Sequence, residues 1–299
     1  MSEQHSITGG GLSATIKTGG AELCGLRGAD GTEYLWNAGP EWPRFAPILF
    51  PIVGKLAGDT LRHAGRAYGM TQHGFARDRR FDWLSRGDDA VRLVLQDDAE
   101  SRGGFPFAFR LEVEYAAGAA GLRCTVTVSN PGPGDLPFSL GAHPAFRWPL
   151  RPGLAKDAHR LTFEAAEPGP VHYLSGGLLG EGEPSPIRGR ELTLAPGLFA
   201  RDALIWRGLA SRSVRYAAPG GPALTFSWEG YPDLGLWSKP DGADFLCIEP
   251  WQGTASPAGW DGEFASKPGV VVLPPAGSRA FTWRVALEPM SAERVALAG

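Results

Sequence analysis

Two-residue alternation of apolar and polar side chains is the dominant pattern along the chain. In residues 12–18 (LSATIKT), Leu12, Ala14 and Ile16 alternate with polar residues, and residues 109–115 (FRLEVEY) follow the same rule. Alternation of this kind places the two sorts of side chain on opposite faces of a β-strand. We therefore expect strands with one face in the core and one face in water.

Two pairs of such segments are predicted to form antiparallel hairpins. Residues 109–115 and 122–130 are separated by the small-residue run AAGAAG, and residues 213–228 carry the turn-forming sequence PGG near their middle. Both arrangements are typical of strands that pair through a short turn. The same reasoning predicts three further strands, which begin at Val91, Val270 and Phe281.

Helical periodicity is scarce in this sequence. The best helical candidates are residues 197–206 (GLFARDALIW) and 290–299 (MSAERVALAG), and both are short. Residues 167–191 are expected to form an extended loop, and long loops often lie over a functional site. The chain is thus predicted to be all-β, with antiparallel sheets packed face to face or curled into a barrel. With no internal repeat or linker-like tract, residues 1–299 are expected to form a single domain.

Composition and charge narrow the possible partners. The 42 glycines and 26 prolines are best interpreted as turns between short strands, because 10 tryptophans and 15 phenylalanines supply ample core material. The net charge of -3, the pI near 6.1 and the lack of a Lys/Arg block argue against a nucleic-acid partner.

The cellular location is predicted from what the sequence lacks. The polar start (MSEQHSITGG) does not resemble a signal peptide, and no stretch reaches the roughly 18 apolar residues of a membrane span. Three cysteines, at positions 24, 124 and 247, are far apart and show no C-x-x-C spacing for zinc or redox chemistry. We expect a cytoplasmic protein with no membrane partner.

Three stretches place titratable side chains among aromatic, glycine and proline residues. They are QHGFARD with His73 and Arg77, SLGAHPAFRWP with His143, and FLCIEPWQG with Glu249. Glu249 follows an apolar run and is expected at the end of a buried strand, where desolvation would raise the pKa of its carboxyl group. A carboxylate with a raised pKa suits a general base, although any one of these residues alone could equally be structural.

Five motifs in register carry a resemblance to a known family. HGFARD, GAHPAF and CIEPWQG occur in that order, with PILFPIVGKL before them and LGLWSKP between the last two. Together they resemble the aldose 1-epimerase (galactose mutarotase-like) family over about residues 20 to 285. The resemblance implies a large antiparallel β-sandwich of the galactose mutarotase-like (supersandwich) type. It also implies an isomerase that interconverts the α and β anomers of a hexose or related sugar.

The resemblance also implies roles for single residues. Glu249 aligns with the family's catalytic base and His143 with its catalytic acid, while His73 and Arg77 are similar to residues that hold the sugar. No metal and no cofactor are expected, because one base and one acid suffice for this chemistry. The partner is a small-molecule sugar, and the protein is expected to be a monomer or a homodimer.

Supporting positions follow from the same motifs. Lys55 stands where relatives often have arginine, Trp237 is placed to stack on a pyranose ring, and Arg44 in WPRFAP is a further candidate for the substrate site. Relatives often carry an aspartate shortly after the EPW run, but this chain reads GTASPAG there. Any auxiliary role of that aspartate is therefore missing from this sequence.

Four alternatives stay open at this stage. A mutarotase for hexose 6-phosphates would use Arg77, Lys55 and Arg44 as positive charge, and a non-catalytic sugar-binding protein would keep the pocket without turnover. A metal site would combine His73, His143 and Glu249 as ligands. A glycosidase would need a second carboxylate, for which Asp233 and Asp244 are available in sequence.

Overall fold

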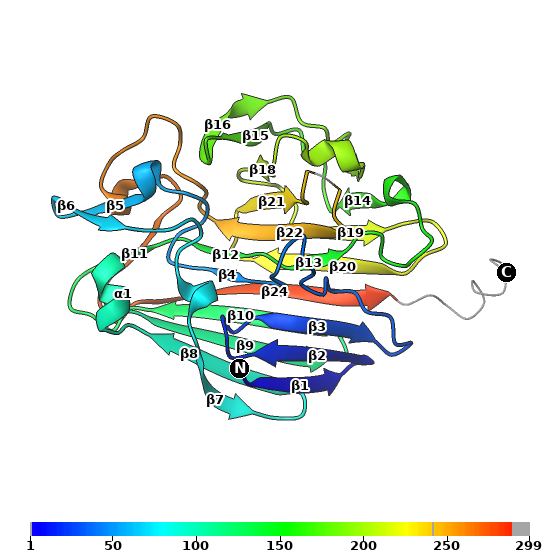
Figure 1. Ribbon diagram of the computed structural model, residues 1–299, viewed down its shortest axis with the longest axis horizontal. Helices are drawn as coiled ribbons and strands as arrows, with labels where there is room; N and C mark the ends of the chain where they lie inside the picture. Colours follow the sequence, from blue (N-terminus) through cyan, green and yellow to red (C-terminus); the bar gives the residue numbers. More distant parts are fainter. Residues whose placement is uncertain (1, 241, 289–299) are drawn as a thin grey trace.

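A computed structural model describes residues 2–240 and 242–288 of the protein (Figure 1). The predicted all-β class is confirmed, since strands dominate and the described strands pair antiparallel with their neighbours. Helical structure in these ranges is short: α1 (Ala99–Gly104), η1 (Ala57–Asp59), η2 (Ala76–Asp78), η3 (Lys156–Ala158), η4 (Pro196–Phe199) and η5 (Phe264–Ser266). None of these helices is long and apolar enough to span a lipid bilayer.

A nine-stranded antiparallel sheet forms one layer of the fold. In order across the sheet, its strands are β17 (Glu191–Thr193), β14 (Arg160–Phe163), β19 (Ser213–Ala217), β20 (Ala223–Glu229), β24 (Ser278–Glu288), β10 (Gly121–Ser129), β9 (Arg110–Gly118), β8 (Ala90–Gln96) and β7 (Asp82–Arg86).

An eight-stranded sheet forms the second layer and carries the candidate site. Its strands are β16 (Leu178–Glu183), β15 (Val171–Ser175), β18 (Leu204–Trp206), β21 (Asp233–Trp237), β22 (Phe245–Gln252), β12 (Leu140–Ala142) and β4 (Ile48–Leu49), with β13 (Ala145–Arg147) also paired to β22. Three smaller sheets complete the fold: β1 (Gln4–Gly9), β2 (Leu12–Lys17) and β3 (Leu23–Gly28); β11 (Leu136–Phe138) and β23 (Val271–Leu273); β5 (Thr60–His63) and β6 (Arg66–Gly69).

The main hydrophobic core lies between the two large sheets. Leu246 and Ile248 of β22 belong to the same buried cluster as Phe226 of β20 and Val126 of β10. Phe146 of β13 contacts Phe226 edge to face, with ring centroids 5.6 Å apart. The expected sandwich of antiparallel sheets is therefore present, and its inner faces are the apolar faces of the alternating strands.

The alternation-based strand predictions are confirmed. β2, β9 and β10 follow a strict buried and half-buried alternation, and β9 and β10 form the expected hairpin with Gly118 opposite Gly121. The second hairpin pairs β19 with β20, and the three further segments correspond to β8, β23 and β24. These strands could be predicted from the sequence because one face of each is more deeply buried than the other.

Two predictions of local structure are wrong. Residues 197–206 do not form a helix: η4 is followed by Asp202 in a left-handed backbone conformation (φ 73°) and then by β18, which pairs with β21. Residues 167–191 are not an extended loop, because they contain the β15–β16 hairpin and lead into β17. In both cases pairing with a neighbouring strand overrides a weak local preference. The helix expected at residues 290–299 lies outside the described residues.

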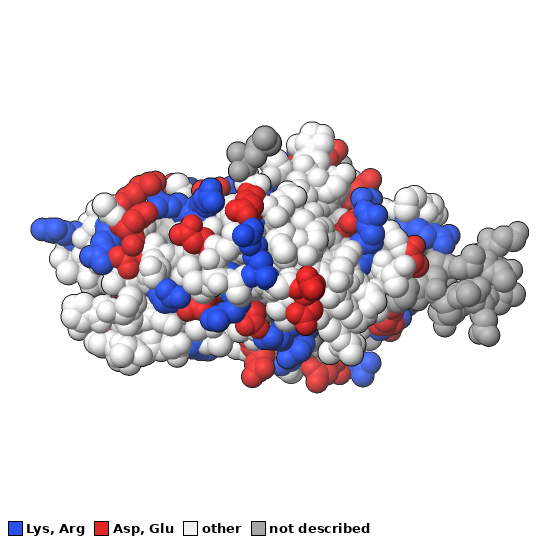
Figure 2. All heavy atoms as spheres, turned by 90° about the horizontal axis from the view of Figure 1, so that it is seen from below, with Lys and Arg blue, Asp and Glu red and all other residues white. Residues whose placement is uncertain are grey.

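Charged side chains are mixed on the surface. Figure 2 shows Lys and Arg interspersed with Asp and Glu across the face seen from below in Figure 1. Ion pairs within the described ranges include Arg92 with Glu112 at 2.6 Å and Arg215 with Glu288 at 2.8 Å. On this face the picture agrees with the small net charge of the chain.

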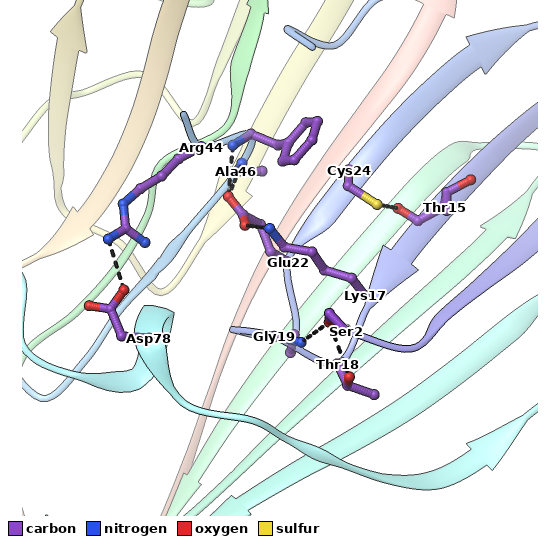
Figure 3. A network of polar contacts seen from close by, with 12 residues as sticks. Ser2, Thr15, Lys17, Thr18, Gly19, Glu22, Cys24, Arg44, Ala46 and Asp78 are labelled. Carbon is purple, nitrogen blue, oxygen red and sulfur yellow. Dashed lines mark hydrogen bonds and ion pairs between the residues drawn. The ribbon is translucent and has the colours of Figure 1, made fainter. Parts of the chain in front are cut away.

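A buried carboxylate fastens the segment before β4 to the N-terminal strands (Figure 3). Oε1 of Glu22 accepts hydrogen bonds from the backbone N–H groups of Phe45 (2.7 Å) and Ala46 (3.0 Å), and its Oε2 forms an ion pair with Lys17. Arg44 in the same segment donates to Asp78 at 2.8 Å. Because Glu22 is only 2% exposed, water cannot replace these contacts if the carboxylate is removed.

Glu22→Ala is expected to lower the free energy of unfolding by about 2–4 kcal/mol, because two buried N–H groups and the Lys17 ammonium lose their acceptor. Glu22→Gln keeps one carbonyl acceptor and is expected to lose less. Urea unfolding followed by tryptophan fluorescence would measure both, with Glu100→Ala on the exposed surface as the control. A Glu22→Ala loss within about 0.5 kcal/mol of the control would contradict this account.

Candidate active site

A cavity of about 300 Å³ lies against β22, at the small end of the range usual for small-molecule sites. Its walls come from segments far apart in the sequence, because the eight-stranded sheet brings β12, β18, β21 and β22 together. The side chains that give it chemical character are Gln72, His73, Arg77, His143, Asp202, Glu249, Trp42, Trp237 and Trp251.

Glu249 lies in the middle of β22 and not at its end, which corrects the expectation from the sequence. All eight residues of this strand are buried, and Glu249 pairs with Gly235 of β21. Alternation along the strand sends Leu246 and Ile248 into the main core, so Cys247 and Glu249 share the opposite face. The strand runs on past Glu249 because Pro250 and Trp251 still pair with β21.

A glycine on the neighbouring strand makes room for the floor of the cavity. A Cβ atom added to Gly235 would lie 2.6 Å from the ring of Trp251, closer than van der Waals contact allows. Gly141 on β12 leaves similar space, since a Cβ there would lie 2.7 Å from the same ring. The ring of Trp251 can therefore lie close to the main chain of β21 and of β12, and it lines the cavity.

His143 and Glu249 are brought together as an adjacent pair. Nε2 of His143 lies 3.1 Å from Oε2 of Glu249, and both side chains are nearly inaccessible to water. The contact lacks the alignment of a hydrogen bond, so Oε2 of Glu249 has no hydrogen-bond partner among the described residues. Nδ1 of His143, the other ring nitrogen, has none there either. Each side chain therefore keeps a polar atom free for a bound ligand.

Burial sets the protonation of this pair. Desolvation raises the pKa of the Glu249 carboxyl well above its usual value, and the negative charge of Asp202 raises it further. Desolvation also lowers the pKa of His143 to about 3, assisted by the positive charges of Arg77 and Arg44. Both effects favour the neutral forms, so a single proton carried by the pair is favoured on Glu249 over His143.

His73 stands beside the pair as a neutral hydrogen-bond donor. Its Nδ1 accepts the backbone N–H of Gly54 at 3.1 Å, which leaves the ring proton of the neutral imidazole on Nε2. Burial and the neighbouring His143 hold the pKa of His73 well below its usual value. The backbone at His73 is left-handed (φ 67°), a conformation that is rare outside glycine and is often found at functional positions.

Arg77 lines the cavity, and Arg44 does not. The Arg77 guanidinium donates to the carbonyl of Gln72 at 2.7 Å, and its buried Nε has no hydrogen-bond partner in the described part of the chain. Arg77 also lines a second cavity of about 460 Å³, which Arg44 shares. Of these two cavities Arg44 lines only the second, although its charge still lowers the pKa of His73 and of His143.

The other two residues expected at the site differ in their positions. Trp237 lines the cavity and packs edge to face against His143, with ring centroids 5.9 Å apart. Lys55 is not among the lining residues, because its ammonium group turns toward Asp59 at 3.3 Å. The pairing of Lys55 with a neighbour four residues along the chain explains why its sequence position was misleading.

Four of the nine side chains that give the cavity its chemical character were not predicted from the sequence, namely Gln72, Trp42, Asp202 and Trp251. Trp42 stacks on the ring of His143, with centroids 5.0 Å apart and planes 24° apart, and it comes from a segment without regular structure. Asp202 lies in the stretch expected to be helical, and its left-handed backbone is visible only in the structure. A charged residue within the run FARDALIW was the only available signal for Asp202.

The structure does not support the sequence-based details of two alternatives. Asp233 and Asp244, named for a glycosidase, do not line the cavity: Asp233 accepts the N–H of Gly208 at 3.0 Å, and Asp244 is exposed and pairs with Lys156. The residues able to hold a metal ion within the described ranges are His143, Cys247 and Glu249. Cys247 thus takes the place that had been considered for His73.

Comparison with known proteins identifies relatives of the same architecture. The family model for aldose 1-epimerase matches residues 3–262. The chain is 32% identical to the chromosomal protein LacX of Lactococcus lactis subsp. lactis over 257 residues, which cover 82% of this chain and 86% of LacX.

Solved structures agree with this assignment. A galactose mutarotase related enzyme from Lactobacillus acidophilus superposes with a TM-score of 0.88 at 28% identity, covering 96% of this chain and 98% of that one. A galactose mutarotase-like protein from Lactobacillus casei ATCC 334 gives a TM-score of 0.87 at 31% identity, with 96% and 100% covered. The resemblance inferred from the five motifs is confirmed, and the chain belongs to the aldose 1-epimerase family.

Proposed function

We propose that the protein is an isomerase that interconverts the α and β anomers of a hexose or a closely related sugar. The observation that carries the proposal is the 3.1 Å contact between His143 and Glu249, which lie side by side in a cavity large enough for a small molecule. Membership of the aldose 1-epimerase family supports the same reaction class.

The reaction needs two proton transfers on one hemiacetal. In the proposed roles, Glu249 accepts the proton of the anomeric hydroxyl while the imidazolium of His143 protonates the ring oxygen. The bond from C1 to the ring oxygen breaks and a C1 carbonyl forms. After rotation about the C1–C2 bond, the ring oxygen attacks the other face of C1, and both protons return to their original groups.

The burial of Glu249 and His143 fits the ring-opened stage of this reaction. Opening the ring leaves Glu249 protonated and His143 neutral, and these are the forms that desolvation favours. The starting form, with a carboxylate and an imidazolium, requires one proton to move from Glu249 to His143, and the two side chains must first align Nε2 with Oε2 across their 3.1 Å contact. The site is thus expected to stabilise the open-chain intermediate and the transition states that resemble it.

Neighbouring side chains are proposed to hold the sugar. The Nε2–H group of His73 is a donor for a ring or hydroxyl oxygen, Arg77 offers further donors, and Trp237 provides an apolar face for the pyranose ring. Asp202 is the remaining charged residue of the lining and is a candidate acceptor for sugar hydroxyl groups. Lys55 and Arg44 have weaker claims because each faces a carboxylate outside this cavity.

One observation favours a second candidate substrate, a hexose 6-phosphate. Arg77 forms part of both cavities, and Arg44 in the second cavity would place another guanidinium near a phosphate that extended past Arg77. Guanidinium groups bind phosphate in a bidentate manner, which suits this arrangement. Asp78 lies between the two arginines and opposes the binding of an anion, so the neutral sugar is preferred.

Glu249→Gln and His143→Gln are each expected to lower kcat by roughly 100-fold to 10,000-fold, because each removes one proton-transfer group. Polarimetry of fresh α-D-glucose and α-D-galactose would measure the rates, with near-ultraviolet circular dichroism to check the fold. Glu167→Gln and His159→Gln change buried residues outside the cavity and serve as matched controls. Full activity of a folded Glu249→Gln protein would remove Glu249 as the base, and sugar binding without anomer exchange by the wild type would indicate a binding protein.

The pH dependence of kcat/KM should reflect a pair that works with one proton. As pH falls, a second proton would inactivate the pair only near the lowered pKa of His143, well below the usual imidazole value of about 6.5. As pH rises, activity would be lost through the raised pKa of Glu249, when the shared proton leaves. Rates measured between about pH 4 and 9, corrected for spontaneous mutarotation, test this. An acid limb at about 6.5 that disappears in a residually active His143→Gln protein would contradict the account.

Turnover of glucose and of glucose 6-phosphate would separate the two candidate substrates. If the phosphate binds between Arg77 and Arg44, Arg44→Gln should lower kcat/KM for the phosphorylated sugar by about tenfold or more and leave glucose unchanged. Arg62→Gln removes a surface arginine paired with Asp261 and is the control. Equal effects of Arg44→Gln on both sugars would exclude a phosphate contact at Arg44.

A further inference from the structure

Cys247 lies next to the two proposed proton-transfer groups, Glu249 and His143. It lies two residues before Glu249 on β22, so both side chains project from the same face of this fully buried strand. Ligand atoms from Cys247, His143 and Glu249 all lie within 4.8 Å of one another. The thiol is therefore close enough to act on the same small ligand as the two proposed proton-transfer groups.

Packing alone does not account for the whole arrangement. Cys247 contributes to a small apolar cluster with Trp36, Ala145 and Phe245, a role that a thiol can fill as a small hydrophobic group. The two residues beside it, however, keep buried polar atoms that lack a hydrogen-bond partner within the described residues, Nδ1 of His143 and Oε2 of Glu249. A site with unsatisfied nitrogen and oxygen atoms next to a thiol has the donor set of a metal centre.

We propose that His143, Cys247 and Glu249 form a binding site for a thiophilic divalent cation such as Zn²⁺ or Cd²⁺, and that the bound cation inhibits the enzyme. The inhibition rests on the proposed function, whereas the binding does not. The neighbouring cavity provides the route of entry, because His143 and Glu249 form part of its wall.

The coordination chemistry is balanced in charge. On binding Zn²⁺, the S–H bond of Cys247 and the O–H bond of the neutral Glu249 carboxyl break, Zn–S and Zn–O bonds form, and both protons leave to water. The thiolate and the Glu249 carboxylate then neutralise the two positive charges, and neutral His143 supplies a nitrogen. Tetrahedral zinc bonds of about 2.0–2.3 Å require ligand atoms roughly 3.5 Å apart, so the ligand atoms, which lie within 4.8 Å of one another, must approach by up to about 1.3 Å.

The ligand set also selects among cations. Thiolate and imidazole ligands favour Zn²⁺ and Cd²⁺ over Mg²⁺ and Ca²⁺, which prefer oxygen ligands. With the metal in place, the electron pairs of Glu249 and His143 that would receive protons are engaged in bonds to the cation. Sugar turnover and metal binding should therefore exclude each other, and chelation of the metal should restore turnover.

Binding is tested first, and without any measurement of activity. Titration of the purified protein with Cd²⁺ should produce the ultraviolet charge-transfer band of a cadmium–thiolate bond, and equilibrium dialysis with Zn²⁺ gives the affinity. Cys247→Ser and Cys247→Ala should abolish the band and weaken Zn²⁺ binding by at least about tenfold. Cys24→Ser and Cys124→Ser remove the other two thiols and should change neither. A band that persists in the Cys247 variants, or equal Zn²⁺ affinity in all proteins, would overturn the site.

Inhibition is tested second, with the substrate that the wild type turns over. Zn²⁺ should inhibit the wild type and its Cys24→Ser variant, EDTA should reverse the inhibition, and Cys247→Ser should keep its turnover at the same Zn²⁺ concentration. Turnover that is unchanged in a wild-type protein with bound zinc would overturn the inhibition. A wild type that binds Cd²⁺ through Cys247 but turns over no sugar would support the metal site and count against the proposed function.

Discussion

The carboxylate of Glu249 lies in the middle of β22, where neighbouring strands on both sides exclude the water that would solvate its charge. A charge in such a place is unfavourable, and the rest of the site is arranged around that fact. His143 lies within proton-transfer distance, Trp42 and Trp237 pack against its imidazole ring, and His73 is fixed as a neutral donor. Burial favours the neutral form of both Glu249 and His143 over two separate charges.

The position of Trp42 depends on contacts remote from the cavity. Its segment is tied to Glu22 through the N–H groups of Phe45 and Ala46, and to Asp78 through Arg44. Asp78 in turn follows Arg77 in the motif that also contains His73. The contacts of Glu22 and of Arg44 drawn in Figure 3, together with the main chain of residues 42–46, thus connect the N-terminal strands, the HGFARD motif and the segment that carries Trp42.

The sequence was informative where burial is one-sided and less so where several strands converge. The alternation in β9 and β10 predicted their hairpin because each has a core face and a wet face. The run 197–206 suggested a helix because local preference does not reveal that β18 will pair with β21.

The same distinction holds for the candidate site. Motifs led to Glu249, His143, His73, Arg77 and Trp237, all of which line one cavity. Lys55 and Arg44 lie outside it, because side-chain direction depends on ion pairs that sequence does not specify. Asp202 lines the cavity but was not predicted. Its position depends on a left-handed backbone conformation that no residue pattern in the sequence indicates.

The location of Glu249 on a strand that is paired on both sides also limits how far the main chain at the site can move. Hydrogen bonds to β21 and β12 restrain the main chain of β22, and Trp251 fills the space left by Gly235 and Gly141. A strand that is hydrogen-bonded on both sides and closely packed has few low-energy displacements, unlike a mobile loop. In an exchange of anomers the sugar would therefore supply the flexibility, turning its own C1 carbon within a nearly stationary protein frame.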